Sequence, residues 1–110
     1  GLLTVSTGGI TATDQNLTVG GAGNTTISSA ITTGAGTLTK DGAGTLTLSG
    51  TNTYTGTTTI NAGNLTLAGG SAIADAGVVN LTGGTLEIDA PETIGRLAGA
   101  GGTSVVLDAT

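Results

Sequence analysis

The sequence predicts an all-β chain wound into a β-solenoid, and three observations lead to this prediction. Short runs alternate threonine with leucine, isoleucine or valine, glycine-rich turns separate these runs, and the unit of strand, turn and strand recurs along the chain. Glycine and threonine disfavour a helix, because glycine costs about 1 kcal/mol there relative to alanine and β-branched side chains are stiff. Self-similarity at a fixed period of about 20 residues or more is the signature of a solenoid.

The expected strand pairs can be followed along the chain. They lie at Leu17–Ser28, within Gly36–Gly63, at Thr57–Leu67, at Val78–Ile88 and at Ile94–Leu107. The apolar centres of the second strands are placed at Ile27, Leu46, Leu65, Leu86 and Val106. These centres are 19, 19, 21 and 20 residues apart. We therefore expect about five coils of roughly 20 residues.

Alternation within each run predicts one dry face and one wet face. In Thr45–Leu48 the leucines share one face of the strand, because successive side chains point to opposite sides. If each strand pairs in parallel with its counterpart one coil later, Leu46, Leu65 and Leu86 form a column of like side chains. The segments Ser49–Gly56, Ala68–Gly77 and Asp89–Gly95 are long enough for a turn and a third short strand. Each coil should then have three faces.

The near absence of aromatic side chains fits a thin aliphatic core. Tyr54 is the one aromatic residue, and the chain has no methionine. A narrow coil has room for stacked Leu, Ile and Val but seldom for a ring. We expect the Tyr54 ring to clamp a coil corner, and an exposed binding ring is the alternative.

The most repetitive segment carries a family resemblance. Leu38–Leu65 reproduces a string of the form LTK-GAGTLTLSG-NTYTG-TTINAG-L almost without interruption, and its flanks Gln15–Gly42 and Glu92–Gly102 are of the same kind. This segment resembles the passenger-associated β-strand repeat of bacterial autotransporters. The resemblance covers nearly the whole chain and is weakest over the first dozen residues.

The resemblance implies a right-handed parallel β-helix, with residues 1–110 as a single segment of a longer passenger. It implies a structural stalk that supports display and vectorial folding during type V secretion, and that contacts host or neighbouring-cell surfaces as part of an adhesin or virulence factor. The implied partner is a C-terminal outer-membrane β-barrel translocator of the same full-length chain. The implied location is the surface of a Gram-negative cell, secreted or anchored to its outer membrane.

Composition argues against most other function classes. The chain has no histidine and no cysteine, so histidine metal sites, thiolate sites and disulfides are excluded. Its net charge is −5, and only Lys40 and Arg96 are positive, which excludes the basic clusters that nucleic acid and anionic membranes require. We therefore predict no enzyme, no catalytic residue, no cofactor and no metal. The turn Gly20–Asn24 is similar to a calcium-binding repeat, but Thr25 stands where that motif needs aspartate.

Two alternative functions remain to be weighed. The best acidic grouping is Glu87, Asp89 and Glu92, with Asp108 one coil later. Such a grouping would suit a β-helical protein that binds or degrades polysaccharide. Catalysis there would also need a nearby basic residue, and only Arg96 is available.

A regular array of Thr-x-Thr pairs on one face would suit an ice-binding solenoid. The pairs are Thr37/Thr39, Thr45/Thr47 and Thr57/Thr59. We align Thr45/Thr47 with Thr26/Ser28, Asn64/Thr66 and Thr85/Glu87, and Thr57/Thr59 with Val78/Asn80. Neither row continues as a threonine array over several coils, so this function is the less favoured alternative.

The two ends of the sequence predict self-association. Neither Gly1–Val5 nor Ser104–Thr110 supplies a charged, proline-bearing or helical cap. Both are aliphatic strands bounded by glycine or threonine, and they could follow one another in a longer array. We therefore expect the isolated chain to associate end to end by parallel strand addition.

Overall fold

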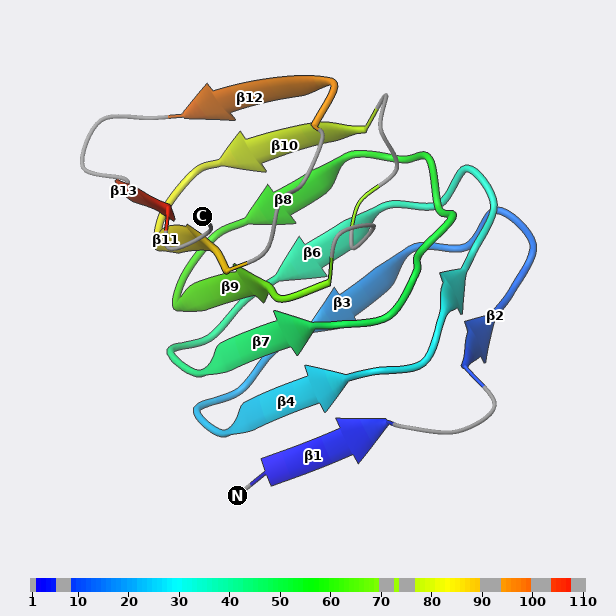
Figure 1. The fold of residues 1–110 in the computed structure, drawn as a ribbon, viewed down its shortest axis with the longest axis horizontal. Helices are drawn as coiled ribbons and strands as arrows, with labels where there is room; N and C mark the ends of the chain where they lie inside the picture. Colours follow the sequence, from blue (N-terminus) through cyan, green and yellow to red (C-terminus); the bar gives the residue numbers. More distant parts are fainter. Residues whose placement is uncertain are drawn as a thin grey trace.

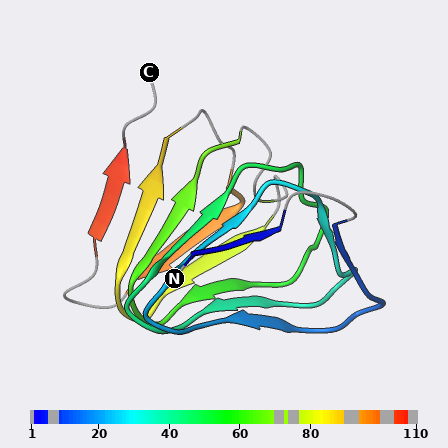
Figure 2. The same cartoon turned by 90° about the horizontal axis from the view of Figure 1, so that it is seen from below.

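The computed structural model describes residues 2–5, 9–69, 73, 77–89, 94–99 and 104–107. Its described residues contain strands and turns but no helix. The chain winds as a right-handed parallel β-helix, advancing from β1 at one end to β12 and β13 at the other (Figures 1 and 2). The predicted fold class is therefore confirmed.

The strands form three parallel sheets, one for each side of the solenoid. The front sheet has the order β1 (Leu2–Val5), β4 (Asn24–Ile27), β7 (Thr45–Leu48), β9 (Asn64–Leu67), β11 (Thr85–Ile88) and β13 (Ser104–Leu107). The back sheet has the order β12 (Arg96–Gly99), β10 (Val78–Leu81), β8 (Thr58–Ile60), β6 (Leu38–Lys40) and β3 (Leu17–Val19). The side sheet pairs β2 (Ile10–Thr11) with β5 (Ile31–Thr32).

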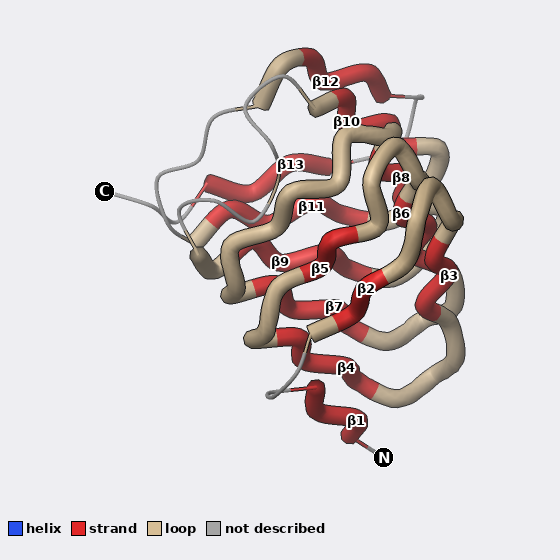
Figure 3. Tube along the Cα trace, turned by 90° about the vertical axis from the view of Figure 1, so that its right-hand side faces the viewer, coloured by secondary structure: helices blue, strands red, loops and turns tan. Residues whose placement is uncertain are grey.

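The third face continues beyond the side sheet (Figure 3). The Thr53 amide donates to the Ile31 carbonyl at 3.0 Å, and the Thr55 amide donates to the Gly34 carbonyl at 2.9 Å. The segment after β7 thus stacks on β5 through the same kind of hydrogen bond that joins the strands. Three faces per coil are confirmed where the structure describes them, but Ser49–Gly56 forms the third face without the short strand expected there. Most of the segments expected at Ala68–Gly77 and Asp89–Gly95 lie outside the described residues.

The front sheet fixes the step from coil to coil. Its aligned positions are Leu3, Thr25, Leu46, Leu65, Leu86 and Val105. The steps between them are 22, 21, 19, 21 and 19 residues. The predicted period of roughly 20 residues is confirmed, and so is the column of Leu46, Leu65 and Leu86.

Two of the predicted alignments are wrong. Ile27 pairs with Leu48 rather than Leu46, and Val105 rather than Val106 pairs with Leu86. Consequently the outward neighbours of Thr45/Thr47 are Asn24/Thr26, not Thr26/Ser28. The first error is a shift of two residues, which keeps the same side chains pointing inward, so apolar alternation alone did not distinguish the two registers. The second error is a shift of one residue, which places Val105 rather than Val106 in the column of Leu86.

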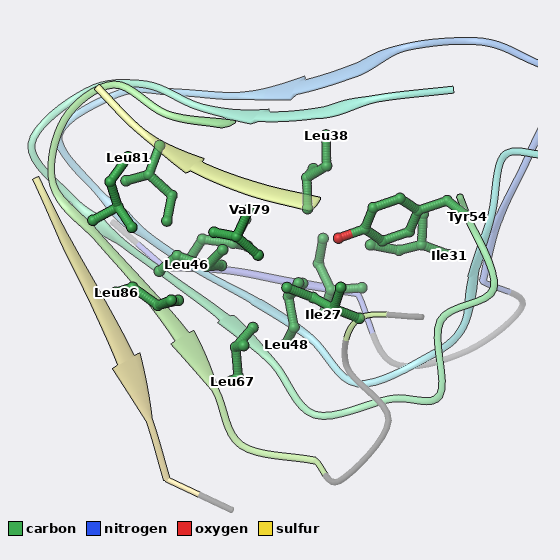
Figure 4. Packing of buried hydrophobic residues seen from close by; sticks show 13 residues of the cluster. Ile27, Ile31, Leu38, Leu46, Leu48, Tyr54, Leu67, Val79, Leu81 and Leu86 are labelled. Atoms are coloured by element: carbon green, nitrogen blue, oxygen red, sulfur yellow. The ribbon is translucent and has the colours of Figure 1, made fainter. Parts of the chain in front are cut away.

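The core lies between the three sheets and is almost entirely aliphatic. Leu46 and Leu48 are buried on β7 while Thr45 and Thr47 on its other face are only half-buried, as alternation predicts. Tyr54 contradicts the prediction for the corner: its ring lies inside the core, 1% exposed, near Ile31 and Leu38 (Figure 4). The interior is therefore wide enough for one ring, supplied by the third face.

Candidate functional site

The buried polar side chains are concentrated between β6 and β9. Lys40, Asn52, Thr58 and Thr66 are buried there, and the Tyr54 hydroxyl lies with them. Outside this span, Thr25 and Thr33 are the buried polar residues of the described chain. Within the described residues, no buried side-chain nitrogen or oxygen lacks a hydrogen-bond partner. A buried polar group costs stability unless it is paired. The hydrogen bonds of these buried side chains therefore restrict how the coil can pack.

Lys40 is the buried cation of this segment. It lies in an inward column of the back sheet, paired with Val19 before it and Ile60 after it, and is 2% exposed. Its ammonium donates hydrogen bonds to the carbonyl oxygens of Asp41 at 2.6 Å and Gly42 at 3.0 Å. Burial lowers the pKa of Lys40 below its usual 10.5, and the Asp41 carboxylate partly opposes that shift.

In the sequence, Lys40 was considered only as one of two positive charges, and its burial was not predicted. The signal for its burial was present, because Lys40 stands two residues from the inward Leu38 and therefore on the same strand face. The corner carbonyls of Asp41 and Gly42 accept the hydrogen bonds that make this burial tolerable.

Asn52 links the third face of one coil to the coil before it. Its side-chain oxygen accepts the backbone amide of Ile31 at 2.8 Å, and the residue is 4% exposed. The amide of Ile31 would otherwise be a buried donor at the start of β5. Asn52 therefore replaces a backbone partner at the corner between the front and side sheets.

Tyr54 and Thr58 form the polar end of the core. The Tyr54 hydroxyl and Thr58 Oγ1 lie 2.7 Å apart, and both residues are buried. Figure 4 shows the hydroxyl pointing inward between the sheets. The alternative of an exposed binding ring at Tyr54 is therefore excluded.

The corner between the back and front sheets carries a ladder of polar side chains, one per coil. Asn61 Nδ2 donates to Asp41 Oδ1 at 3.0 Å, and the Thr82 hydroxyl donates to Asn61 Oδ1. Other Asx side chains reach forward to the next coil: the backbone amides of Ala35, Thr37 and Thr45 donate to Asp14, Asn16 and Asn24, at 2.8, 2.9 and 3.0 Å. These bonds join successive coils outside the strands.

The acidic grouping is only partly described. Glu87 lies on the outer face of the front sheet, paired with Thr66, and Asp89 is exposed just beyond β11. Glu92 and Asp108 lie outside the described residues. Arg96 begins β12 in the back sheet and is exposed, so it belongs to a different sheet from Glu87 (Figure 1).

In the described residues, no group of three or more acidic residues could hold a metal ion. At the calcium-like turn, the Asn24 side-chain oxygen is engaged by the Thr45 amide. No helix in the described part of the chain has the length and hydropathy to cross a membrane.

The threonine pairs align on two outer faces. On the back sheet Thr18, Thr39 and Thr59 form a column that continues with Asn80, and on the front sheet Thr26, Thr47 and Thr66 continue with Glu87. The back-sheet run thus spans three coils, whereas the front-sheet run begins with Thr4, which pairs with Thr26, and spans four. The predicted break at Val78/Asn80 is observed.

Residues 38–67 match the model described as the passenger-associated-transport-repeat. This match supports an autotransporter passenger repeat at these residues. The passenger repeat runs from β6 to β9 and contains Lys40, Asn52, Tyr54 and Thr58. No curated protein and no solved structure matched the chain.

The passenger repeat contributes a complete coil of the solenoid. Its strands pair with β3 and β4 on one side and with β10 and β11 on the other. Passenger repeats and β-solenoids are typically structural. In this one, buried Asn52 joins its coil to the coil before it, whereas the Tyr54–Thr58 hydrogen bond lies within a single coil. The geometry therefore supports a structural role, in which the repeat is held to the coils on either side of it.

Proposed function

We propose that residues 1–110 form one continuous stalk segment of an autotransporter passenger, displayed on the surface of a Gram-negative cell. The observation that carries the proposal is the passenger repeat at residues 38–67, stacked in parallel register with strands on both sides. A solenoid of this kind grows by nearest-neighbour contacts, so it can extend a functional module away from the cell.

The proposed partner is a C-terminal outer-membrane translocator of the same full-length chain. Each coil can fold on the one before it, because its hydrogen bonds and its apolar columns are made with adjacent coils. Folding outside the cell would then help to draw the remaining chain outward. An adhesive role towards host or neighbouring cells belongs to the same proposal, with the outer faces of the sheets as the contacting surface.

Surface display of the full-length protein tests the stalk. We expect Leu65→Asp to lower the amount of protease-resistant passenger at the cell surface several-fold, because it introduces a charge into the core column. Thr47→Asp, on the outer face of the front sheet, should leave display unchanged. Equal display of wild type and Leu65→Asp would show that display does not depend on a folded solenoid here.

A second experiment separates the stalk from an enzyme. The purified chain is incubated with a panel of bacterial and plant polysaccharides, and the release of reducing ends is measured. We expect no release. Cleavage that is lost in Glu87→Gln would assign an activity to the acidic grouping and would replace the stalk as the primary function.

A further inference from the structure

Lys40 is the one lysine of the chain, and its side chain is almost completely enclosed by the fold. It lies inward on β6, in a column between Val19 of the coil before and Ile60 of the coil after. β6 has a strand on either side, β3 and β8 (Figure 1). The enclosure of Lys40 therefore comes from the coils that stack on both sides of it, and not from either end of the solenoid.

The Lys40 ammonium is packed into the turn that follows β6. Its hydrogen bonds to the carbonyl oxygens of Asp41 and Gly42, at 2.6 and 3.0 Å, fold this turn around the end of the side chain. The next coil covers the amine as well, because a Cβ built on Gly63 would lie only 2.9 Å from Lys40 Nζ. A group added to Nζ would therefore have to displace either the turn or the backbone of the next coil.

Charge does not account for a protected amine at Lys40. Burial lowers the pKa of Lys40, so at a given pH its amine is neutral more often than that of an exposed lysine. The neutral amine is the nucleophilic form, so an accessible Lys40 would react faster than an ordinary lysine. Slow reaction of the folded chain would thus report enclosure rather than protonation.

We propose that Lys40 is an acylation site in the unfolded chain alone, and that acylation prevents the passenger repeat from closing. The neutral Nζ attacks the carbonyl carbon of an activated acyl donor, such as an acyl thioester. The C–N bond forms, the thiolate leaves, and the nitrogen loses one proton to solvent. This inference rests on the packing around Lys40 and goes beyond the stalk.

The acylated side chain does not fit the contacts that the ammonium makes. An amide nitrogen keeps one N–H where the ammonium has three, and the acyl group adds an oxygen that only accepts hydrogen bonds. The Asp41 and Gly42 carbonyls would then share one donor, beside a bulkier group that faces Gly63. Unpaired buried acceptors and the added volume both oppose closure of the coil.

Reaction with N-hydroxysuccinimide acetate, followed by peptide mass spectrometry, tests the enclosure. Ala43→Lys adds a second amine at an exposed position of the same turn, so one molecule carries both amines. In the folded variant we expect Lys40 to be acetylated at least about a hundredfold more slowly than the amine at position 43, because it reacts only when the coil opens. In concentrated urea the two should react at similar rates. Equal rates in the folded protein would overturn the proposal.

Refolding after acetylation tests the effect on the repeat. The unfolded wild type is acetylated, the urea is diluted, and refolding is followed by far-UV circular dichroism and by a second urea titration. We expect chains that carry the acetyl group at Lys40 to lose the strand signal or to unfold at a clearly lower urea concentration than untreated chains. Recovery of the untreated midpoint by these chains would overturn the proposal.

Lys40→Met is the matched control, because the reagent then finds no side-chain amine. Acetylated and untreated Lys40→Met should have the same urea midpoint. The double variant Lys40→Met/Ala43→Lys carries its acetyl group outside the core and should also keep its midpoint. A loss there as large as in the wild type would show that the place of Lys40 does not matter, and would overturn the proposal. If Lys40→Met does not fold, Lys40→Arg takes its place, since arginine keeps the charge and is not acylated by this reagent.

Discussion

The Tyr54 hydroxyl and Thr58 Oγ1 meet at 2.7 Å inside a core that is otherwise aliphatic. Tyr54→Phe removes one side of this bond and leaves the Thr58 hydroxyl in apolar surroundings. We expect Tyr54→Phe to lower the free energy of unfolding by about 1–3 kcal/mol, measured by urea denaturation. The double variant Tyr54→Phe/Thr58→Val should lose less than the two single losses combined, because it removes both polar partners. Additive losses would show that the two hydroxyls act independently.

The aliphatic column of the front sheet gives a second prediction. Leu46 and Leu65 are fully buried and paired, so Leu46→Asp or Leu65→Asp brings an unpaired charge into the core. Each should cost several kcal/mol of unfolding free energy. Thr47→Asp, between Leu46 and Leu48 but on the outer face, should change stability by only about 0.5 kcal/mol. Urea unfolding of the three variants provides the measurement, and equal losses on both faces would contradict the observed burial.

Lys40 gives a prediction for the dependence of stability on pH. Its pKa is lowered in the folded state chiefly by burial, while in the unfolded chain it titrates near 10.5. Between the folded and the unfolded pKa the unfolded chain binds more protons, so stability rises with pH across that interval. Below the folded pKa, burying the charged Lys40 destabilises the fold by its full amount. Above 10.5 Lys40 is neutral in both states, and this destabilisation is gone.

Comparison with Lys40→Met isolates this contribution. Both proteins keep Tyr54 and all seven carboxylates, so the other titrations are shared. We expect the stability of the wild type relative to Lys40→Met to rise as pH increases towards 10.5, as followed by urea midpoints. A relative stability that falls over this range would mean that the pKa of Lys40 is raised rather than lowered.

Much of the fold could be predicted from the sequence because alternation and period act locally. The inward leucines of β7, β9 and β11 follow from a two-residue repeat, and the solenoid follows from the coil period. The register between β4 and β7 could not be predicted in the same way. Alternation permits both Ile27–Leu46 and Ile27–Leu48, and the second places Thr25 beside Leu46.

Corner contacts hold the observed register. The side-chain oxygens of Asp14, Asn16 and Asn24 each accept a backbone amide 21 residues later. These bonds depend on how the corners stack in space, which composition and spacing do not reveal. The position of Tyr54 was missed for a different reason: two-residue alternation marks it as inward, but the expectation based on ring size outweighed it. The same alternation marks Lys40 as inward, although no position was predicted for it.

Asn52 provides a test of such a corner contact. Its side-chain oxygen accepts the buried Ile31 amide at 2.8 Å, so Asn52→Ala leaves that amide without this acceptor. We expect a loss of about 1–3 kcal/mol in the free energy of unfolding. The neighbouring Thr51 is exposed, and Thr51→Ala should change stability by less than about 0.5 kcal/mol. Hydrogen exchange of the Ile31 amide gives a local readout: exchange at the wild-type rate in Asn52→Ala would show that the side chain does not protect it.

The last prediction concerns the corner glycines. Gly63 has φ +69°, a conformation that costs an L-residue about 1–2 kcal/mol, and a Cβ there would clash with the carbonyl oxygens of Gly42 and Gly44 in the preceding coil. Strain and clash act together, so Gly63→Ala should cost clearly more than about 2 kcal/mol of unfolding free energy.

Gly20→Ala is the matched control. No left-handed φ is required at Gly20, and a Cβ there would lie 3.5 Å from the Asp41 Cβ. Replacing this glycine restricts the unfolded chain, so stability should be unchanged or should rise by about 0.4–1 kcal/mol. The two variants add the same methyl group on the same side of the solenoid, and thermal or urea unfolding compares them directly. Equal effects of Gly63→Ala and Gly20→Ala would show that close stacking of the Gly63 backbone on the previous coil does not limit this corner.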